Sequence, residues 1–269
     1  MTRENPAALF HRLHQEGLLI LPNAWDAGSA RLIESRGARA IATTSAAVAW
    51  AHGYADGDLL PVSILAVTVA EIARVIRVPL SVDLEAGYAS DPATVGAHVG
   101  TIVEAGAVGI NLEDGTGSPD LLCAKIEQAK RAGERRGVEL FVNARTDAFL
   151  HGLVSPERRV EETLARAARY QAAGADGIFV PGLVDATAIG VVARELKRPL
   201  NVLARAGLPA APALAELGVR RLSAGSGIAS ALYGRAAVLA SDFLRTGESA
   251  PLLEGAMAYR EVNALMGAG

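Results

Sequence analysis

Short apolar runs alternate with longer amphipathic stretches along the whole chain. The runs are rich in Val, Ile, Leu and Ala, and each ends in small or polar residues. Runs of this length and composition are typical of strands that are buried on both faces of a parallel sheet. Eight such runs are present, at residues 18–26, 38–46, 79–87, 107–115, 139–147, 176–182, 199–207 and 219–227.

The stretches between these runs repeat apolar residues at helical spacing and end in Gly or Pro. Asp91 before Pro92, and Ser155 before Pro156, are typical helix starts, because a capping side chain precedes a proline in the first turn. Alternating strands and helices predict parallel strands with right-handed crossovers. Eight units in 269 residues match the length of a (β/α)8 barrel. We therefore predict an α/β fold with a single domain over residues 1–269, a closed (β/α)8 TIM barrel rather than an open doubly wound sheet.

Two further helices are predicted after the last strand, within residues 226–269. These segments contain more Ala and Leu than a solvent-exposed tail needs. We expect these extra C-terminal helices to lie in an oligomer interface.

The composition fits this architecture and narrows the function. The chain is 51% hydrophobic but only 4% aromatic, so its core is built mainly from aliphatic residues. The net charge is −3, and no cluster of Lys and Arg interleaves with aromatic residues, which argues against a nucleic-acid surface. Cys123 is the only cysteine, which excludes an intramolecular disulfide.

The amino terminus lacks the pattern of a signal peptide, and no segment offers about 18 uncharged apolar residues, so we expect a cytoplasmic protein that does not enter a membrane.

Acidic residues end two neighbouring strands of the predicted barrel. Asp83 and Glu85 share the face of segment 79–87 that points inward when the intervening Val and Leu pack on helices, and Glu113 takes the same face in segment 107–115. Three close carboxylates repel one another and need a cation. Ligation by oxygen alone suits Mg²⁺, with Mn²⁺ as an alternative.

The next strand ends in the sequence NARTD, where Asn143, Arg145 and Asp147 share a face. The guanidinium of Arg145 could bind a substrate carboxylate in a fork while Asp147 holds it from behind. Two alternatives stay open: a pair of Arg145 and Asp147 that only closes the barrel end, and a structural cluster in which Arg145 pairs with the acids of the preceding strands.

The second predicted strand runs into TTSAAVA, residues 43–49. Small residues and free backbone N–H groups at the start of a helix suit the binding of a carboxylate or phosphonate. Ser45 as an ordinary helix cap is the competing interpretation.

Together these segments resemble the isocitrate lyase/phosphoenolpyruvate mutase superfamily. The order and spacing of the motifs make the resemblance specific, and it covers most of the chain. It rests on NAWDAGSARLIESRGARAIATTSAAVA (23–49), HGYADGD (52–58), PLSVDLEAGYAS (79–90), AGAVGINLEDG (105–115), VNARTDAFL (142–150), GADGIFVPG (174–182) and LGVRRLSAGS (217–226).

The resemblance implies a role for each matching position. Its members form or break C–C or P–C bonds through a metal-stabilised enolate, bind Mg²⁺, and assemble as tetramers that exchange helices between subunits. For this chain it implies a homotetramer built as a dimer of dimers. The implied metal ligands are Asp83, Glu85 and Glu113; the implied catalytic residues are Arg145 and Asp56, the latter in the metal-water network; and the implied substrate contacts are Thr44, Ser45, Ala46, Asp83 and Arg145.

The sequence also departs from the family pattern. Lyases of the family that act on isocitrate or methylisocitrate carry a K-[KR]-C-G-H loop with an acid/base Cys, whereas this chain reads GTGSPDLLCAK at 115–125. Cys123 falls on a predicted helix, where simple packing is the favoured interpretation. The loop also lacks the Lys and Asn of the phosphonopyruvate branch. Glu85 stands where Asp is usual, and Ala46 stands where Gly is usual.

These observations favour a Mg²⁺-dependent lyase-type enzyme that cleaves a C–C bond of a small 2-oxo or 2-hydroxy di- or tricarboxylate. Oxaloacetate is the simplest substrate that does not require the missing Cys. The alternatives are a P–C bond enzyme acting on phosphonopyruvate and a non-catalytic binder of 2-oxo acids. A Schiff-base aldolase requires a Lys at a strand end, and Lys125, Lys130 and Lys197 all lie outside the predicted strands.

Overall fold

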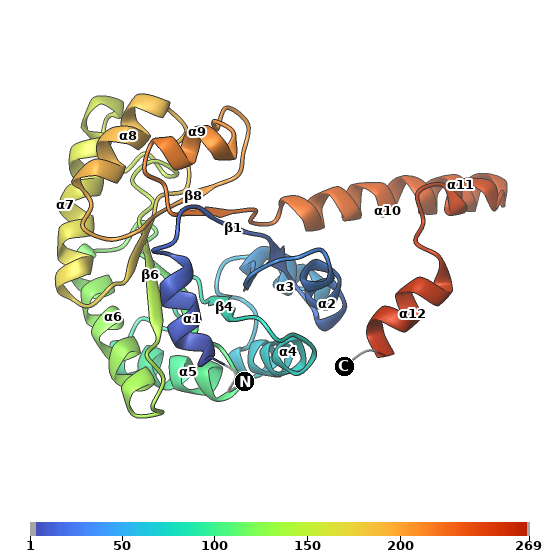
Figure 1. The fold of residues 1–269 in the computed structure, drawn as a ribbon, viewed down its shortest axis with the longest axis horizontal. Coiled ribbons are helices and arrows are strands. Elements are labelled where there is room, and N and C mark those ends of the chain that lie inside the picture. Colours follow the sequence, from blue (N-terminus) through green and yellow to red (C-terminus); the bar gives the residue numbers. More distant parts are fainter. Residues whose placement is uncertain (1–3, 268–269) are drawn as a thin grey trace.

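The computed structural model describes residues 4–267, which form a parallel barrel surrounded by helices (Figure 1). Its strands pair in the order β1-β9-β8-β7-β6-β5-β4-β3-β2, and every pair is parallel. The strands are β1 Leu19–Leu21, β2 Asn23–Ala24, β3 Ile41–Thr43, β4 Leu80–Asp83, β5 Gly109–Glu113, β6 Phe141–Arg145, β7 Gly177–Phe179, β8 Leu200–Leu203 and β9 Arg221–Ser223.

The barrel closes through its first strand, which is split in two. β1 pairs with β9 on one side, whereas β2 pairs with β3 on the other. Pro22 lies between the two halves, and it has no N–H to donate to a strand ladder. The predicted (β/α)8 barrel is therefore confirmed, and each of the eight predicted runs contains a strand.

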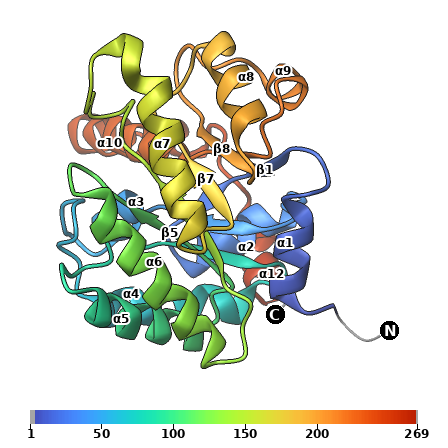
Figure 2. The ribbon, with the colours of Figure 1, turned by 90° about the vertical axis from the view of Figure 1, so that its left-hand side faces the viewer.

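Helices cover the outside of the barrel. Figure 2 shows α5 (Pro92–Glu104), α6 (Pro119–Glu134) and α7 (Arg159–Ala172) side by side along this outer layer. Asp91 accepts a hydrogen bond from the first turn of α5, as predicted, and Ser118 accepts one from the first turn of α6. Ser155 precedes the short turn at Pro156–Arg158 as predicted, but its side chain makes no capping hydrogen bond there. The helices that follow the strands are α2 Ala27–Ser35, α3 Ser45–Ala51, α4 Val62–Val75, α5 Pro92–Glu104, α6 Pro119–Glu134, α7 Arg159–Ala172 after the short turn η1 Pro156–Arg158, α8 Ala186–Glu195 and α9 Ala211–Glu216.

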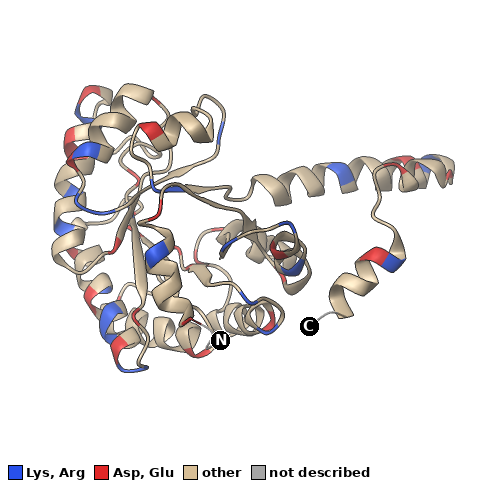
Figure 3. Ribbon diagram, viewed as in Figure 1, with Lys and Arg blue, Asp and Glu red and all other residues tan. Residues whose placement is uncertain are grey.

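The C-terminal segment leaves the barrel. α10 (Gly227–Thr246) projects outward, α11 (Ala250–Leu253) follows, and α12 (Tyr259–Gly267) returns beside α2 (Figure 1). Charged residues are sparse along most of α10 (Figure 3). Its exposed large apolar side chains include Leu232, Val238, Phe243 and Leu244. Within residues 4–267, none of the helices is long and apolar enough to cross a membrane.

Helix α1 (Pro6–Leu13) closes the amino end of the barrel. Phe10 is fully buried and lies edge-to-face with Phe141 of β6, with ring centroids 5.3 Å apart. His14 stacks on the same Phe141 ring at 4.1 Å. Gly109 of β5 leaves room for Phe10, because a Cβ at this position would lie 2.6 Å from the Phe10 ring. The barrel floor is thus built from aromatic rings.

His14 gives the barrel floor a pH dependence. Its Nδ1 donates to the Phe10 carbonyl over 2.8 Å, and the ring is 2% exposed. Burial first, then the positive charges of Arg221 and His11, lower the pKa of His14 to about 3, although the Phe10 carbonyl opposes the shift. The folded pKa lies below the unfolded value of about 6.5, so the stabilising contribution is complete above about pH 6.5 and is lost as the pH falls towards 3.

We expect His14→Asn to flatten the acid limb of the stability curve. Between pH 7 and pH 5 the wild type should lose about 2 kcal/mol of unfolding free energy more than the variant, because each pH unit below the unfolded pKa costs about 1.4 kcal/mol. Urea unfolding at the two pH values measures the difference, and the comparison with the variant removes the contribution of the carboxylates. Equal losses in both proteins would contradict the assignment.

Candidate active site

The carboxyl ends of β3 to β6 gather the predicted site residues at one mouth of the barrel. Across neighbouring strands, Asp83 is the Cα partner of Asn111, and Glu113 is the partner of Arg145. The carboxyl ends of barrel strands are where active sites of this architecture lie. The inward alternation predicted for Asp83, Glu113 and Arg145 therefore brings these three residues together.

Asp83 is the last residue of β4 and faces the start of α3. Its carboxylate accepts from the Ser45 amide at 3.2 Å and from Asn111 Nδ2 at 3.4 Å. Its own amide donates to Thr43 Oγ1 at 2.9 Å. The cap position of α3 is occupied by Thr44, whose side chain makes no capping hydrogen bond, so Ser45 is not an ordinary cap. The Ser45 amide at the helix start thus donates to the candidate metal ligand.

Arg145 is held between two carboxylates. Its Nε and Nη2 donate to the two oxygens of Asp147 over 2.7 and 3.0 Å, and its Nη1 lies 2.7 Å from Glu113 Oε2. The Asp147 side chain is fully buried. The structure therefore contains both the supporting fork from Asp147 and a pairing of Arg145 with one of the predicted metal ligands.

Burial and the surrounding carboxylates shift the pKa values of both Glu113 and Arg145. Burial raises the pKa of Glu113 to about 8; Arg145 opposes this shift, and the charges of Asp83, Asp147 and Glu85 add to it. Burial alone would lower the pKa of Arg145, but the surrounding carboxylates outweigh it and raise the pKa. Arg145 therefore stays charged, and Glu113 is the acid whose charge is least favoured without a further cation.

Glu85 lies in a different position from the one predicted. β4 ends at Asp83, so the strand alternation does not extend to Glu85, whose φ of 49° is in the left-handed region. Its carboxylate accepts from the amides of Gly57 and Asp58 at 2.9 and 2.6 Å, and from the Tyr88 hydroxyl at 2.8 Å. A left-handed non-Gly residue costs about 1 kcal/mol or more, which these three bonds offset. Glu85 thus fixes the loop between α3 and α4.

That loop brings Asp56 to the site. The Ser45 hydroxyl bonds to Asp56, and the charge of Asp83 acts on it. Burial is the largest cause of its raised pKa, with Asp83 adding to the shift and the Ser45 hydroxyl opposing it. Asp56 therefore lies where a water-mediated contact with a metal at Asp83 could form. Its catalytic role stays a prediction.

These side chains suit a divalent cation that binds one or two carboxylates directly and keeps several waters. Within residues 4–267, no group of three or more His, Cys, Asp or Glu side chains forms a ready-made metal cage. Mg²⁺ commonly binds proteins through only one or two carboxylates and keeps several waters. Asp83 offers such a carboxylate, and the charges of Asp56 and Glu113 act in the same space. All these donors are oxygens, which suits Mg²⁺ or Mn²⁺.

Sequence reasoning missed the support behind Arg145. Asp114 alternates with Glu113 and turns outward, where it accepts from the Asp147 amide at 2.9 Å. It also accepts from Arg166 Nη1 at 2.9 Å and from the Tyr170 hydroxyl at 2.5 Å. The available signal was the Arg and Tyr four residues apart on α7, which place two donors on one helix face. Helix α7 is thereby connected to Arg145 through Asp114 and Asp147.

We expect Tyr170→Phe to lower the unfolding free energy by about 1–3 kcal/mol, because it leaves a buried carboxylate short of one donor. Tyr233→Phe is the matched control, since the Tyr233 side chain lies on the exposed face of α10 and is 47% exposed. Urea unfolding of both variants measures the effect. A loss no larger than that of the control would show that the Asp114 bond carries no net stability.

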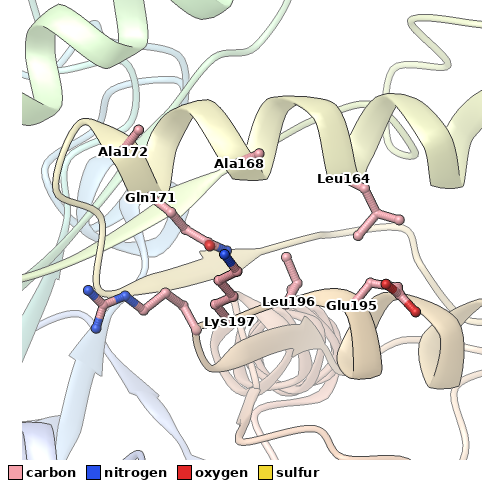
Figure 4. Close-up of a pocket in the computed structure, with 8 residues that line it drawn as sticks. Leu164, Ala168, Gln171, Ala172, Glu195, Leu196 and Lys197 are labelled. Atoms are coloured by element: carbon pink, nitrogen blue, oxygen red, sulfur yellow. The ribbon is translucent and has the colours of Figure 1, made fainter.

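One surface hollow is remote from this site. It has a volume of about 580 Å³ and lies between the carboxyl-terminal parts of α7 and α8, lined by Leu164, Gln171, Leu196 and Lys197 among others (Figure 4). It contains none of the predicted site residues. A second hollow of about 510 Å³ reaches the site, because Glu113 and Asp114 line it together with Lys125 and His151.

The lysines are not placed for Schiff-base chemistry. Lys125 and Lys130 lie on α6, and Lys197 follows α8. The Lys125 ammonium donates to the Ala86 carbonyl at 2.6 Å. Cys123 is also on α6, half-buried against the core, and burial raises the pKa of its thiol. This agrees with the packing role predicted for Cys123.

Comparison with known proteins identifies the family. The model of the phosphoenolpyruvate phosphomutase family matches residues 10–244. The chain belongs to this family. It is thus a member of the superfamily predicted from the motifs, which unites phosphoenolpyruvate mutase with isocitrate lyase and whose members are lyases or mutases.

Several members of the family are similar over most of the chain. An uncharacterized protein of Mycobacterium tuberculosis is 38% identical over 248 residues, 90% of this chain and 91% of the relative. Oxaloacetate decarboxylase of Paraburkholderia xenovorans is 32% identical over 230 residues, 80% of this chain and 73% of the relative. 2-Methylisocitrate lyase of Aeropyrum pernix is 31% identical over 211 residues, 73% of this chain and 65% of the relative.

Solved structures agree with the fold. A Burkholderia cenocepacia J2315 protein, provisionally described as a phosphonomutase, superposes with a TM-score of 0.83 at 40% identity, covering 88% of this chain and 99% of that one. Phosphonopyruvate hydrolase, crystallised with oxalate and Mg²⁺, gives a TM-score of 0.86 at 22% identity, covering 98% of this chain and 95% of that one, which shows a common fold.

Proposed function

We propose that this protein is a Mg²⁺-dependent enzyme that cleaves a C–C bond of a small 2-oxo or 2-hydroxy di- or tricarboxylate, with oxaloacetate as the simplest substrate. The observation that carries the proposal is the fixed Arg145 guanidinium beside the acids at one barrel mouth. A cation-binding carboxylate and a positioned guanidinium are complementary to a chelating 2-oxo acid.

Each residue then has a defined task. Asp83 would hold the ion directly, and Asp56, Glu85 and Glu113 would act through its waters, with Mn²⁺ able to replace Mg²⁺. The ion would supply Lewis-acid stabilisation of the charge that develops on the 2-oxygen. Arg145 would bind the substrate carboxylate, and Asp147 keeps its guanidinium in one orientation. Thr44, Ser45 and Ala46 would form the wall at the start of α3.

The absence of an acid/base thiol favours decarboxylation. Cys123 packs against the core on α6, and burial raises the pKa of its thiol, so it is a poor proton donor and acceptor at neutral pH. Oxaloacetate loses CO₂ and then needs only one proton, which water can deliver, whereas cleavage of methylisocitrate requires removal of a hydroxyl proton. The similarity to oxaloacetate decarboxylase of Paraburkholderia xenovorans supports the same choice.

Phosphonopyruvate is the second candidate substrate. The observation in its favour is the 40% identity to the Burkholderia cenocepacia protein provisionally described as a phosphonomutase. Arg145 and the acids would serve this substrate too. The loop at 115–118 reads GTGS and lacks the Lys and Asn expected of that branch.

A rate assay with oxaloacetate, methylisocitrate and phosphonopyruvate, each with Mg²⁺ and with chelator, tests the proposal. The expected result is Mg²⁺-dependent pyruvate formation from oxaloacetate above the rate of the free ion. Turnover that survives chelation would contradict the metal mechanism. Turnover of phosphonopyruvate alone would support the second candidate, and tight binding without turnover of any of the three would identify a binder of 2-oxo acids.

We also propose a homotetramer, a dimer of dimers, in which α10 to α12 exchange between subunits. Leu232, Val238 and Phe243 are about half-exposed on α10, and burying such a face is favourable by about 25 cal/mol per Å². Light scattering coupled to gel filtration measures the mass. A monomeric mass at micromolar concentration would contradict the assembly.

A further inference from the structure

A buried arginine lies inside the barrel beneath the candidate active site. Arg221 begins β9 and is 0% exposed, the largest of the fully buried side chains within residues 4–267. Its Cα neighbours across the sheet are Leu19 and Asn201. Its Nε donates to Ser223 Oγ at 3.0 Å, and Ser223 Oγ in turn donates to Asn201 Oδ1 at 3.2 Å. Because Ser223 is nearer the carboxyl end of the strand, the guanidinium extends along the barrel towards the site.

The two terminal nitrogens of this guanidinium have no hydrogen-bond partner among the described residues. Within residues 4–267, Arg221 also has no carboxylate oxygen within 4.0 Å, whereas Arg145 and Arg166 both form such ion pairs. Burial lowers the pKa of Arg221 to about 9, with Asp83 opposing the shift, so the side chain is positively charged at neutral pH. A buried charge without a partner is strongly unfavourable, which sets this residue apart from the other arginines of the barrel.

Two further polar side chains of the barrel strands each have a buried, unpartnered atom in the described part of the chain. Asn201 Nδ2 and Ser81 Oγ are buried and have no partner within residues 4–267. Asn201 neighbours Arg221 in the sheet, and Ser81 lies two residues before Asp83 on the inner face of β4. The two terminal nitrogens of Arg221, Asn201 Nδ2 and Ser81 Oγ can each donate a hydrogen bond. The region is therefore rich in donors and carries a positive charge.

The neighbours limit what such a region can hold. The strands around it pack closely, because a Cβ at Gly109 would lie 2.6 Å from Phe10 and a Cβ at Gly177 would lie 2.9 Å from Asn143 Oδ1. On the side of α1, His14 Nε2 is also unpartnered; because Nδ1 donates to Phe10, this nitrogen carries a lone pair in the neutral ring.

We propose that Arg221 binds a small monovalent inorganic anion of the size of chloride within the barrel, with Asn201 Nδ2 and Ser81 Oγ as further donors. The anion neutralises the buried guanidinium and supplies an acceptor to donors that otherwise have none. Its binding can be measured without turnover, so the test does not depend on which reaction the enzyme catalyses. A ligand that binds only the folded chain also raises its stability.

Halide binding to the wild-type protein is the direct test. Crystals soaked in sodium bromide are expected to show an anomalous peak beside the Arg221 guanidinium. In solution, thermal unfolding is followed while sodium chloride replaces sodium gluconate at constant ionic strength. The melting temperature should rise saturably, by about 3 °C at a tenfold excess over the dissociation constant. No peak and no chloride dependence would mean that water alone occupies the region, which would overturn the proposal.

Matched variants separate this site from general salt effects. Arg221→Met should abolish the chloride dependence, whereas Arg198→Met, which changes an exposed arginine, should retain it. If Arg221→Met fails to fold, Ser81→Ala should still weaken the dependence at least threefold in halide concentration. An unchanged dependence in the variant that is tested would overturn the proposal. A bromide peak without any chloride-dependent stability would show binding at crystal concentration only and would also overturn it.

Discussion

Asp83→Asn is expected to lower kcat/KM for the Mg²⁺-dependent substrate by about 10³-fold or more, because it removes the carboxylate that would bind the ion and several kcal/mol of electrostatic stabilisation. Asparagine has the same shape, so the barrel should fold normally. Its amide oxygen can still accept from Ser45, whose amide now donates to Asp83 over 3.2 Å. The fall in kcat/KM should therefore result from the lost charge and not from altered packing.

Steady-state kinetics over a range of Mg²⁺ concentrations measures this effect. Asp242→Asn is a suitable control, because Asp242 lies on α10, where it pairs with Arg245 at an exposed position. The control should keep wild-type activity. If Asp83→Asn retained more than a tenth of the wild-type kcat/KM, Asp83 could not be the ligand on which the reaction depends.

Arg145 should give the second large effect. Arg145→Met leaves the carboxylates of Glu113 and Asp147 without their cation, and breaking a buried pair in this way costs about 3–5 kcal/mol of stability. Arg145→Lys keeps the charge but loses the fork that engages both oxygens of Asp147. We expect this variant to fold and to bind the substrate carboxylate about 10²-fold more weakly.

The two Arg145 variants distinguish binding from folding. Urea unfolding reports the stability of each variant, and oxalate titration reports carboxylate binding in the folded protein. Wild-type oxalate affinity in Arg145→Lys would contradict the proposed role, because a lysine cannot reproduce a planar two-point contact. A stable Arg145→Met protein would instead show that Glu113 takes up a proton when its partner is removed.

Much of the fold was predictable from the sequence, because its signals are local. Each buried strand is an apolar run, and a capping side chain followed by proline marks the start of α5 at Asp91. The division of the first strand was not predicted. Pro22 is compatible with either one irregular strand or two, and only the pairing of β1 with β9 and of β2 with β3 decides it.

The candidate site was predictable as far as strand alternation holds. Asp83, Glu113 and Arg145 lie on strands and meet as expected. Glu85 lies beyond the end of β4 in a left-handed conformation, and its bonds to the loop at 57–58 depend on contacts between residues far apart in sequence. Periodicity contains no information about such contacts.

The buried polar side chains were the least predictable part. Asp114 differs from an ordinary turn residue only through its bonds to Arg166 and Tyr170 on α7. Arg221 sits between an arginine and a leucine in the sequence, and nothing there distinguishes the buried arginine from its less buried neighbour Arg220. Only the register of β9 turns Arg221 into the barrel.

Calorimetric titration of Mg²⁺ into the protein with oxalate present tests the central claim most directly. We expect about one ion per chain, bound by the wild type at least 100-fold more tightly than by Asp83→Asn, since Mg²⁺ uses few protein carboxylates and completes its shell with water and ligand oxygens. Equal Mg²⁺ affinity in the two proteins, or no Mg²⁺ binding by the wild type with oxalate bound, would contradict a metal site at Asp83.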